Sequence, residues 1–160
     1  MSSNLQNNIW KQFLKTNTHI STTILRVTLG LIMLPHSLQK MFGWFGGNGF
    51  AGTMNYFTGF LGIPEFLAFL AIVTEFVGAL ALIAGLVTRL WAFGISILMA
   101  TAMFMIHFQN GFFINWSGQQ AGEGIEFHLL VIGITIVLMI LGGGKWSLDN
   151  RLTAKLKPAK

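Results

Sequence analysis

The residues best suited to chemistry in this chain are five ionisable side chains that lie beside apolar segments. They are His36, Lys40, His107, Glu126 and His128. Histidine exchanges protons near neutral pH, and a neighbouring carboxylate sets which ring nitrogen carries the proton. If the fold brings these side chains together, the cluster suits proton transfer or hydrogen bonding to a polar ligand.

Two further charged residues, Arg26 and Glu75, lie inside apolar segments. Arg26 precedes His36 by ten residues and Glu75 follows Glu65 by ten. In helices, both would therefore lie about 15 Å from the same boundary. Ionisable side chains within a membrane segment face the protein interior and pair with one another. We therefore expect a buried Arg26–Glu75 ion pair, which serves either as a structural link between helices or as the polar floor of a site.

The composition indicates that lipid surrounds the elements that position these residues. Of 160 residues, 53% are hydrophobic and 9% are charged, against about 25% charged in a soluble domain. A single domain of this length cannot bury so much apolar surface in its own core. Four apolar segments lie at about 20–39, 66–87, 90–106 and 127–142, near the length of about 20 residues that a bilayer-spanning helix needs. The predicted fold is all-α, an integral membrane four-helix bundle.

The distribution of positive charge predicts the orientation of this transmembrane domain (20–144). Most lysines and arginines lie in the N-terminal tail (1–19), the basic C-terminal tail (145–160) or the turn at 88–89, whereas the opposite side has Lys40 alone. Cytoplasmic segments carry the excess of lysine and arginine, so we expect both termini to face the cytoplasm.

The start of the chain has a second interpretation. Lys11 and Lys15 precede an apolar run, which also fits a signal peptide. No small-residue cleavage site follows that run, and this favours a membrane helix.

Antiparallel threading brings the five ionisable residues to the outer end of the bundle. Glu126 and His128 are two positions apart, so on a helix they point about 200° away from each other. Only one of them can face the bundle, and the spacing leaves open which one does.

Two outer loops, 41–63 and 108–124, are rich in glycine and aromatic residues. Irregular backbone cannot face lipid, so these segments should fold over the end of the bundle, with a short helix near 51–60. Their aromatic residues would act either as anchors at the membrane surface or as a lid over a site.

Several chemistries are disfavoured. The chain has no cysteine, which excludes disulfides and thiolate ligands. Met99, Met103 and His107 share a helix face, but methionines in so apolar a chain are expected as packing, and we predict no metal site. The basic residues lie at the chain ends and form no patch among aromatic residues, so the lipid bilayer is the expected partner and nucleic acid is not.

Several sequence blocks in order resemble the DoxX family of small bacterial membrane proteins. They are Arg26 followed by Gly30, HSLQK at 36–40, FGWFGGNGFAG at 42–52, LGIPE at 61–65, HFQNGFFINW at 107–116, GEGIEFHLL at 122–130 and GGGKWSLD at 142–149. The resemblance implies a four-helix protein of the cytoplasmic membrane. It also implies an association with quinone-linked redox systems, including thiosulfate or quinol oxidoreductase subunits, and with responses to quinones and oxidative stress.

Three functions follow from these expectations. The first is a quinone-linked oxidoreductase protein or subunit. In it, the carbonyl oxygens of a bound quinone accept hydrogen bonds from His107, His36 or Lys40, and no cofactor is covalently attached. Histidine and Glu126 would then pass protons to the outer water. The second is a non-catalytic subunit or scaffold that docks a redox partner protein. The third is a small transporter that uses Arg26 and Glu75 as a coupling pair.

Overall fold

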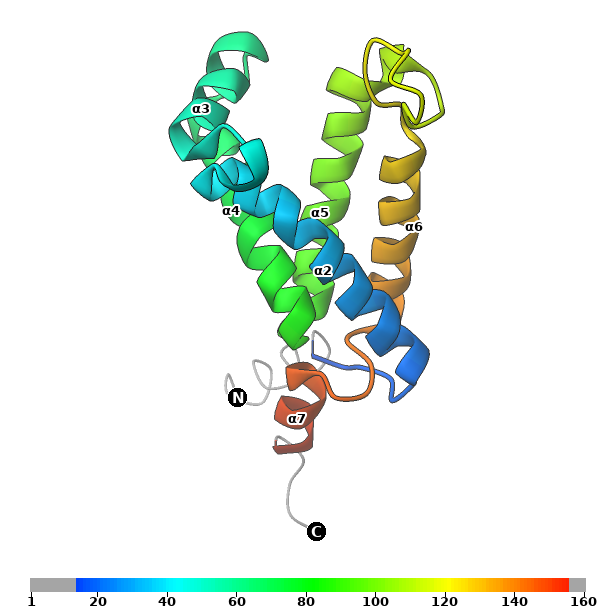
Figure 1. The fold of residues 1–160 in the computed structure, drawn as a ribbon. Coiled ribbons are helices and arrows are strands. Elements are labelled where there is room, and N and C mark those ends of the chain that lie inside the picture. The colour runs from blue at the N-terminus through cyan, green and yellow to red at the C-terminus, as the bar shows by residue number, and fades with distance from the viewer. Residues whose placement is uncertain (1–13, 156–160) are drawn as a thin grey trace.

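The computed structural model describes residues 14–155, and this part of the chain contains helices and no strands. Four long helices form its body: α2 (Ile20–Phe42), α4 (Glu65–Ala84), α5 (Thr88–Ala102) and α6 (Glu126–Leu141). Shorter elements complete it: η1 (Trp44–Gly46), α3 (Gly49–Asn55), η2 (Tyr56–Phe60), η3 (Met103–His107), η4 (Phe108–Asn110) and α7 (Leu148–Lys155). The all-α prediction is confirmed for the described residues, and Figure 1 shows the arrangement.

Two of the described helices are long and apolar enough to cross a membrane. They are α4 and the continuous helix Thr88–Asn110, which joins α5 to η3 and η4. α6 is a shorter apolar helix of 16 residues. The four spans of the predicted bundle therefore remain a prediction, although a helix lies at each predicted position.

Each long helix packs against two others: α2 against α4, α4 against α5, α5 against α6, and α6 against α2, the last pair less extensively. Their shared core is made of Leu29, Met33, Ala79, Leu82, Ala92, Ile95, Met99, Val131 and Leu138. Gly30 allows α2 to approach α4 closely, since a methyl group there would lie 2.9 Å from the main-chain oxygen of Ala79. Small residues at such crossings are typical of helices that associate without a hydrophobic driving force.

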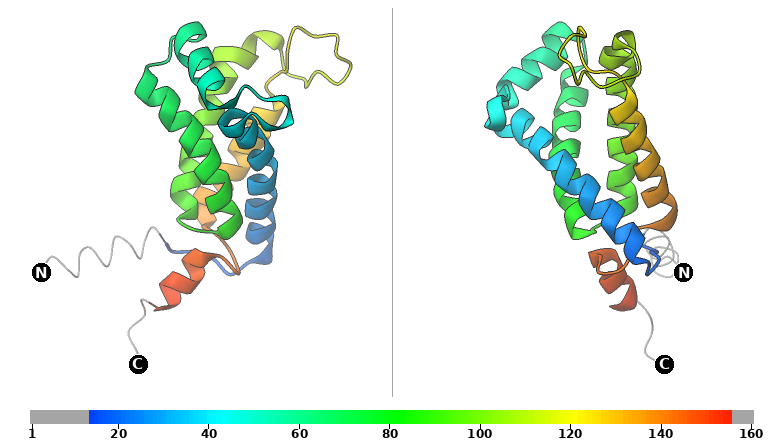
Figure 2. Two further views of the ribbon diagram at one scale, coloured as in Figure 1. Left: turned by 60° about the vertical axis from the view of Figure 1, so that its left-hand side comes forward. Right: turned by 45° about the vertical axis from the view of Figure 1, so that its right-hand side comes forward.

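The bundle is open at one end. The four long helices lie closest together near α7, and α2 with α4 diverges from α5 with α6 toward α3 (Figures 1 and 2). We call the end that carries α3 and the loop 111–125 the open end, and the opposite one the α7 end. The divergence separates the helix pairs that carry the predicted site residues.

The two ends of the described chain meet at the α7 end. The main-chain nitrogen of Asn17 donates to the Leu141 oxygen at 3.0 Å, and the Thr153 hydroxyl donates to the Leu14 oxygen at 3.0 Å. Residues 1–13 of the predicted N-terminal tail and 156–160 of the C-terminal tail lie outside the described residues. The side of a membrane on which this end lies stays a prediction.

The predicted Arg26–Glu75 ion pair is wrong. Arg26 is 2% exposed, and its guanidinium donates to main-chain oxygens: Nε to Gly143 at 2.8 Å, Nη1 to Ile83 at 2.7 Å and also to Leu82. Leu82 and Ile83 lie in the last turn of α4, where carbonyls lack the usual helical partners, and Arg26 donates to both. The Leu82 oxygen also accepts from the main-chain nitrogen of Gly85 at 3.2 Å. The prediction counted the depth of Arg26 from His36 as the end of the helix. In the structure α2 continues past His36 to Phe42, so Arg26 lies at the α7 end and its side chain does not meet that of Glu75.

Asp149, at the start of α7, fixes the turn between α4 and α5. Its carboxylate accepts hydrogen bonds from the main-chain nitrogens of Val87 at 2.6 Å and Thr88 at 2.9 Å. Val87 has a φ of 48°, which is unfavourable for a β-branched residue. The buried carboxylate thus both caps α5 and stabilises a strained residue.

Candidate functional site

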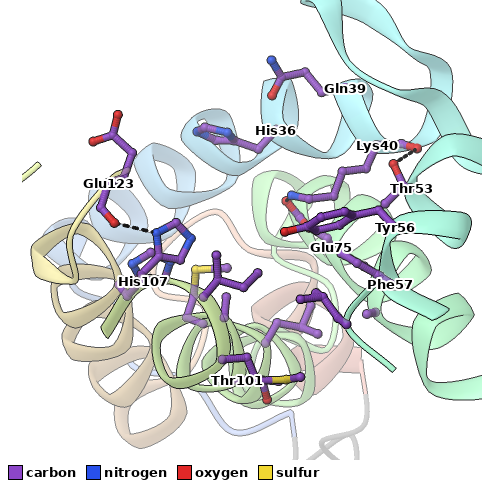
Figure 3. Close-up of a pocket in the computed structure, with 18 of the residues that line it drawn as sticks. His36, Gln39, Lys40, Thr53, Tyr56, Phe57, Glu75, Thr101, His107 and Glu123 are labelled. Carbon is purple, nitrogen blue, oxygen red and sulfur yellow. Dashed lines mark hydrogen bonds and ion pairs between the residues drawn. The ribbon is translucent and has the colours of Figure 1, made fainter. Parts of the chain in front are cut away.

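A cavity of about 660 Å³ lies at the open end, between the diverging helices and under the segments that follow α2 and α5. Most of its wall is apolar and comes from all four long helices. The polar side chains at its wall include His36, Lys40, Glu75 and His107 (Figure 3). His128 is a further polar wall residue. The volume and the few polar groups in an apolar wall are typical of small-molecule sites.

Four of the five predicted site residues line this cavity, and one does not. His36, Lys40, His107 and His128 are wall residues, whereas Glu126 is absent from the wall. The structure also answers the question that the spacing left open: His128 faces inward and is 6% exposed, while Glu126 is half-exposed. Their opposite directions follow from the two-residue separation on α6.

His107 and His128 form the histidine side of the cavity. Their ring centroids lie 4.2 Å apart, with one ring from η3 and the other from α6. The Nδ1 atom of His107 lies 2.8 Å from the main-chain oxygen of Glu123 (Figure 3). A carbonyl only accepts, so Nδ1 carries the proton and Nε2 of the neutral ring is left as an acceptor.

His36 lies at the margin of the cavity. Its side chain is exposed, and its ring centroid is 5.9 Å from that of Phe127 on α6. His36 therefore borders the site from α2 and is more accessible than the two other histidines.

On the side formed by α2 and α4, Lys40 and Glu75 form an ion pair, with 2.6 Å between Nζ and Oε1. The side chain of Glu75 is 7% exposed and that of Lys40 is 32% exposed. The hydroxyl of Thr53, in α3, donates to the main-chain oxygen of Lys40 at 3.3 Å and links the pair to the roof of the cavity. Glu75 thus belongs to the cavity wall together with Lys40.

Sequence reasoning missed several polar wall residues, among them Tyr56 and Glu123. Tyr56 is the only tyrosine of the chain and belongs to η2, within the segment near 51–60 that was expected to be helical. Glu123 contributes through its main chain, which no side-chain pattern signals. Its position between Gly122 and Gly124, in the loop that precedes α6, was the available hint.

The loop 111–125 is folded back on itself beside the cavity. Main-chain hydrogen bonds join Gly124 to Phe113 at 3.1 Å and Glu126 to Phe112 at 2.9 Å. The Glu123 carboxylate accepts from the main-chain nitrogen of Asn115 at 2.7 Å. These bonds fix the Glu123 carbonyl that His107 contacts.

The arrangement can hold a ring-shaped apolar molecule with polar substituents. His107 offers an acceptor nitrogen on one side, and the Lys40–Glu75 pair offers both donors and an acceptor on another. Among residues 14–155, no three histidine, aspartate or glutamate side chains are grouped as ligands of a metal ion.

Comparison with known proteins identifies the family. The family model described as DoxX matches residues 21–108, which is more than half of the chain. The chain belongs to the DoxX family. The match covers Arg26, Lys40, Glu75 and His107, and it ends before Glu123 and His128.

Curated relatives of this DoxX protein are similar over most of their length. "Putative oxidoreductase CatD" of Bacillus subtilis is 28% identical over 130 residues, which cover 81% of this chain and 85% of the relative. Inner membrane protein YqjF of Escherichia coli is 31% identical over 121 residues, 71% of this chain and 82% of the relative. An uncharacterized protein of Haemophilus influenzae is 30% identical over 143 residues, 88% of each chain. No solved structure matches.

Proposed function

We propose that this DoxX protein is a four-helix protein of the bacterial inner membrane with both termini in the cytoplasm. Two helices with the length and hydropathy of membrane spans support this, as does the name of the Escherichia coli relative. Large apolar side chains exposed on the helix surfaces, such as Leu31, Phe66 and Leu130, would face lipid. The positive charge at the α7 end supports a cytoplasmic location of that end.

We further propose that the cavity binds a quinone and that the protein takes part in quinone-linked redox chemistry. The observation that carries this proposal is the cavity itself, an apolar space of about 660 Å³ with His107, His128 and the Lys40–Glu75 pair at its wall. The word oxidoreductase in the name of the Bacillus subtilis relative agrees with it. A quinone supplies two-electron, two-proton chemistry when bound.

The residues of the chain would bind the ring and handle its protons. Lys40 donates a hydrogen bond to a carbonyl oxygen of the quinone and is itself held by Glu75. Nε2 of His107 accepts or returns a proton. His128 packs against the His107 ring and helps to keep it in place. The apolar wall formed by residues such as Met99 and Phe57 excludes water from the ring. Electrons would pass to a partner protein that has its own redox centre.

Titration of the detergent-purified protein with a short-chain benzoquinone tests this proposal. We expect saturable binding by the wild type, and binding at least about tenfold weaker in His107→Ala, which loses the contact between the imidazole and the quinone ring. His19→Ala is the matched control, because His19 is exposed at the α7 end. Absent binding in the wild type, or equal binding in all three proteins, would rule out the proposal.

A scaffold that docks a redox partner is the second candidate. It is favoured by the exposed aromatic residues of the loop 111–125, among them Trp116 at 84% exposure and Phe113 at 65%. Capture of the same redox protein by the wild type and by His107→Ala, but not by Trp116→Ala, would support docking through this loop. The transporter alternative is weakened because its coupling pair, Arg26–Glu75, is not formed.

A further inference from the structure

We infer that His107 is a proton-transfer residue that links the ligand cavity to a second, outer cleft, and that Glu123 is the positioning residue for its ring. The inference rests on the proposed function for the source of the protons. Its geometric basis, in contrast, is present without any ligand.

The outer cleft lies next to the ligand cavity and has a volume of about 480 Å³. Its wall is formed by Ile106, His107, Gln109, Asn110, Ala121, Gly122 and Glu123. Ile106, His107 and Glu123 are also wall residues of the ligand cavity. The same imidazole therefore borders both spaces, and the second space is built mainly from polar and small side chains that water can contact.

Two hydrogen bonds converge on the main-chain oxygen of Glu123. His107 Nδ1 donates to it at 2.8 Å, and Asn110 Nδ2 donates to it at 3.1 Å. The proton of the neutral His107 ring is therefore held on Nδ1, and Nε2 is the nitrogen that can take up another proton. A ring fixed in this tautomer can act as a base without first having to rearrange.

The loop 111–125 holds this oxygen in place. Glu123 Oε2 accepts from the Asn115 main-chain nitrogen at 2.7 Å. This hydrogen bond across the loop restricts the movement of residue 123 and therefore of its main-chain oxygen. The same residue thus positions His107 through its carbonyl group and is itself positioned through its carboxylate.

Transfer then uses both nitrogens of the ring. A proton from the cavity binds to Nε2 and converts the ring to an imidazolium, which still donates to Glu123 through Nδ1. The imidazolium releases the Nδ1 proton to water in the outer cleft, whose wall holds Asn110 and Glu123 beside this nitrogen. Exchange through water then returns the remaining proton to Nδ1, the position that the Glu123 oxygen favours. One proton enters, one leaves, and the ring returns to its starting form.

The first test is the tautomer of His107. The full chain with ¹⁵N-labelled histidine is studied in detergent micelles, and the His107 signals are assigned by their loss in His107→Gln. We expect the neutral ring to carry its proton on Nδ1 in the wild type and in the control Glu126→Ala. In Glu123→Ala the loop loses its brace, and we expect signals of both tautomers. A neutral ring protonated on Nε2 in the wild type would overturn the inference.

The second test closes the outer cleft. The chain has no cysteine, so Ala121→Cys introduces a single thiol at the cleft wall, and a bulky water-soluble reagent attached there would block it. We expect the exchange of the His107 Nδ1 proton with water to slow by about tenfold or more, because this nitrogen lies beside the cleft residues Asn110 and Glu123. The same reagent on Ala154→Cys, an exposed position in α7, should change nothing. An unchanged exchange rate after closure at residue 121 would overturn the inference.

The benzoquinone titration separates this inference from the proposed function. The protein modified at residue 121 should still bind the quinone with wild-type affinity, because the ligand cavity is not blocked. If the unmodified wild type does not bind quinone, the proposed function is ruled out. The tautomer and exchange measurements would then still decide whether His107 can transfer protons between the two spaces.

Discussion

Lys40 of α2 and Glu75 of α4 form an ion pair at the wall of the cavity at the open end, with 2.6 Å between Nζ and Oε1. The two partners differ in their surroundings, since Glu75 is far more buried than Lys40. Removal of Lys40 and removal of Glu75 should therefore lower the free energy of unfolding by different amounts.

Removal of the lysine should destabilise the fold more than removal of the carboxylate. Lys40→Met leaves a buried, unpaired charge on Glu75 and should lower the free energy of unfolding by about 3 to 5 kcal/mol. In Glu75→Gln the partly exposed Lys40 can turn to water, so the loss should be smaller. The double variant should recover much of the stability. Denaturant unfolding in detergent measures all three, and additive losses would contradict the pairing.

Arg26 should matter through main-chain carbonyls and not through Glu75. Arg26→Met leaves the buried oxygens of Leu82, Ile83 and Gly143 without this donor and should cost about 3 kcal/mol in the free energy of unfolding. Arg151→Met, at an exposed position, is the control. A double-mutant cycle of Arg26→Met with Glu75→Gln should give no coupling energy. Coupling above about 1 kcal/mol would restore the ion pair that the structure lacks.

Asp149 should stabilise the turn between α4 and α5. Asp149→Ala removes both acceptors for the nitrogens of Val87 and Thr88, and we expect a loss of about 1 to 3 kcal/mol in the free energy of unfolding. Glycine adopts a positive φ without strain, so Val87→Gly should have a free energy of unfolding up to about 1 kcal/mol higher than that of the wild type. If Val87→Gly is instead destabilising, strain at this residue is not significant.

The orientation in the membrane can be tested with single cysteines, because the chain has none of its own. Asn115→Cys, in the loop at the open end, should react with an impermeant maleimide in spheroplasts. Arg151→Cys, in α7, should react only after the membrane is broken, since we expect that end in the cytoplasm. The reverse pattern, or labelling of both in intact spheroplasts, would contradict the proposed topology.

Sequence reasoning was most successful where hydropathy and helix periodicity decide the outcome. Each predicted span contains a long helix, and His36, Lys40, His107 and His128 lie at one cavity as expected. A spacing of two residues showed that Glu126 and His128 could not both face the bundle. It could not show which one does, because that depends on how α6 is rotated against α5.

The errors have a common physical cause. The position of a side chain along a helix axis was estimated from assumed ends, and α2 is longer than assumed. Arg26 therefore meets the end of α4, and Lys40 takes the place beside Glu75. Glu123 was missed because its contact with His107 is made by a main-chain oxygen, which is the same in every residue type.

The central claim is that a ring-shaped ligand binds between the histidine pair and the Lys40–Glu75 pair. The most direct measurement is photolabelling of the membrane-embedded protein with an azidoquinone, followed by mass spectrometry of the labelled peptides. We expect labels on residues of the cavity wall, such as Tyr56, Met105 and His107, and expect excess unlabelled quinone to prevent them. Labels confined to the α7 end, or labels at the cavity that excess quinone leaves unchanged, would contradict the claim.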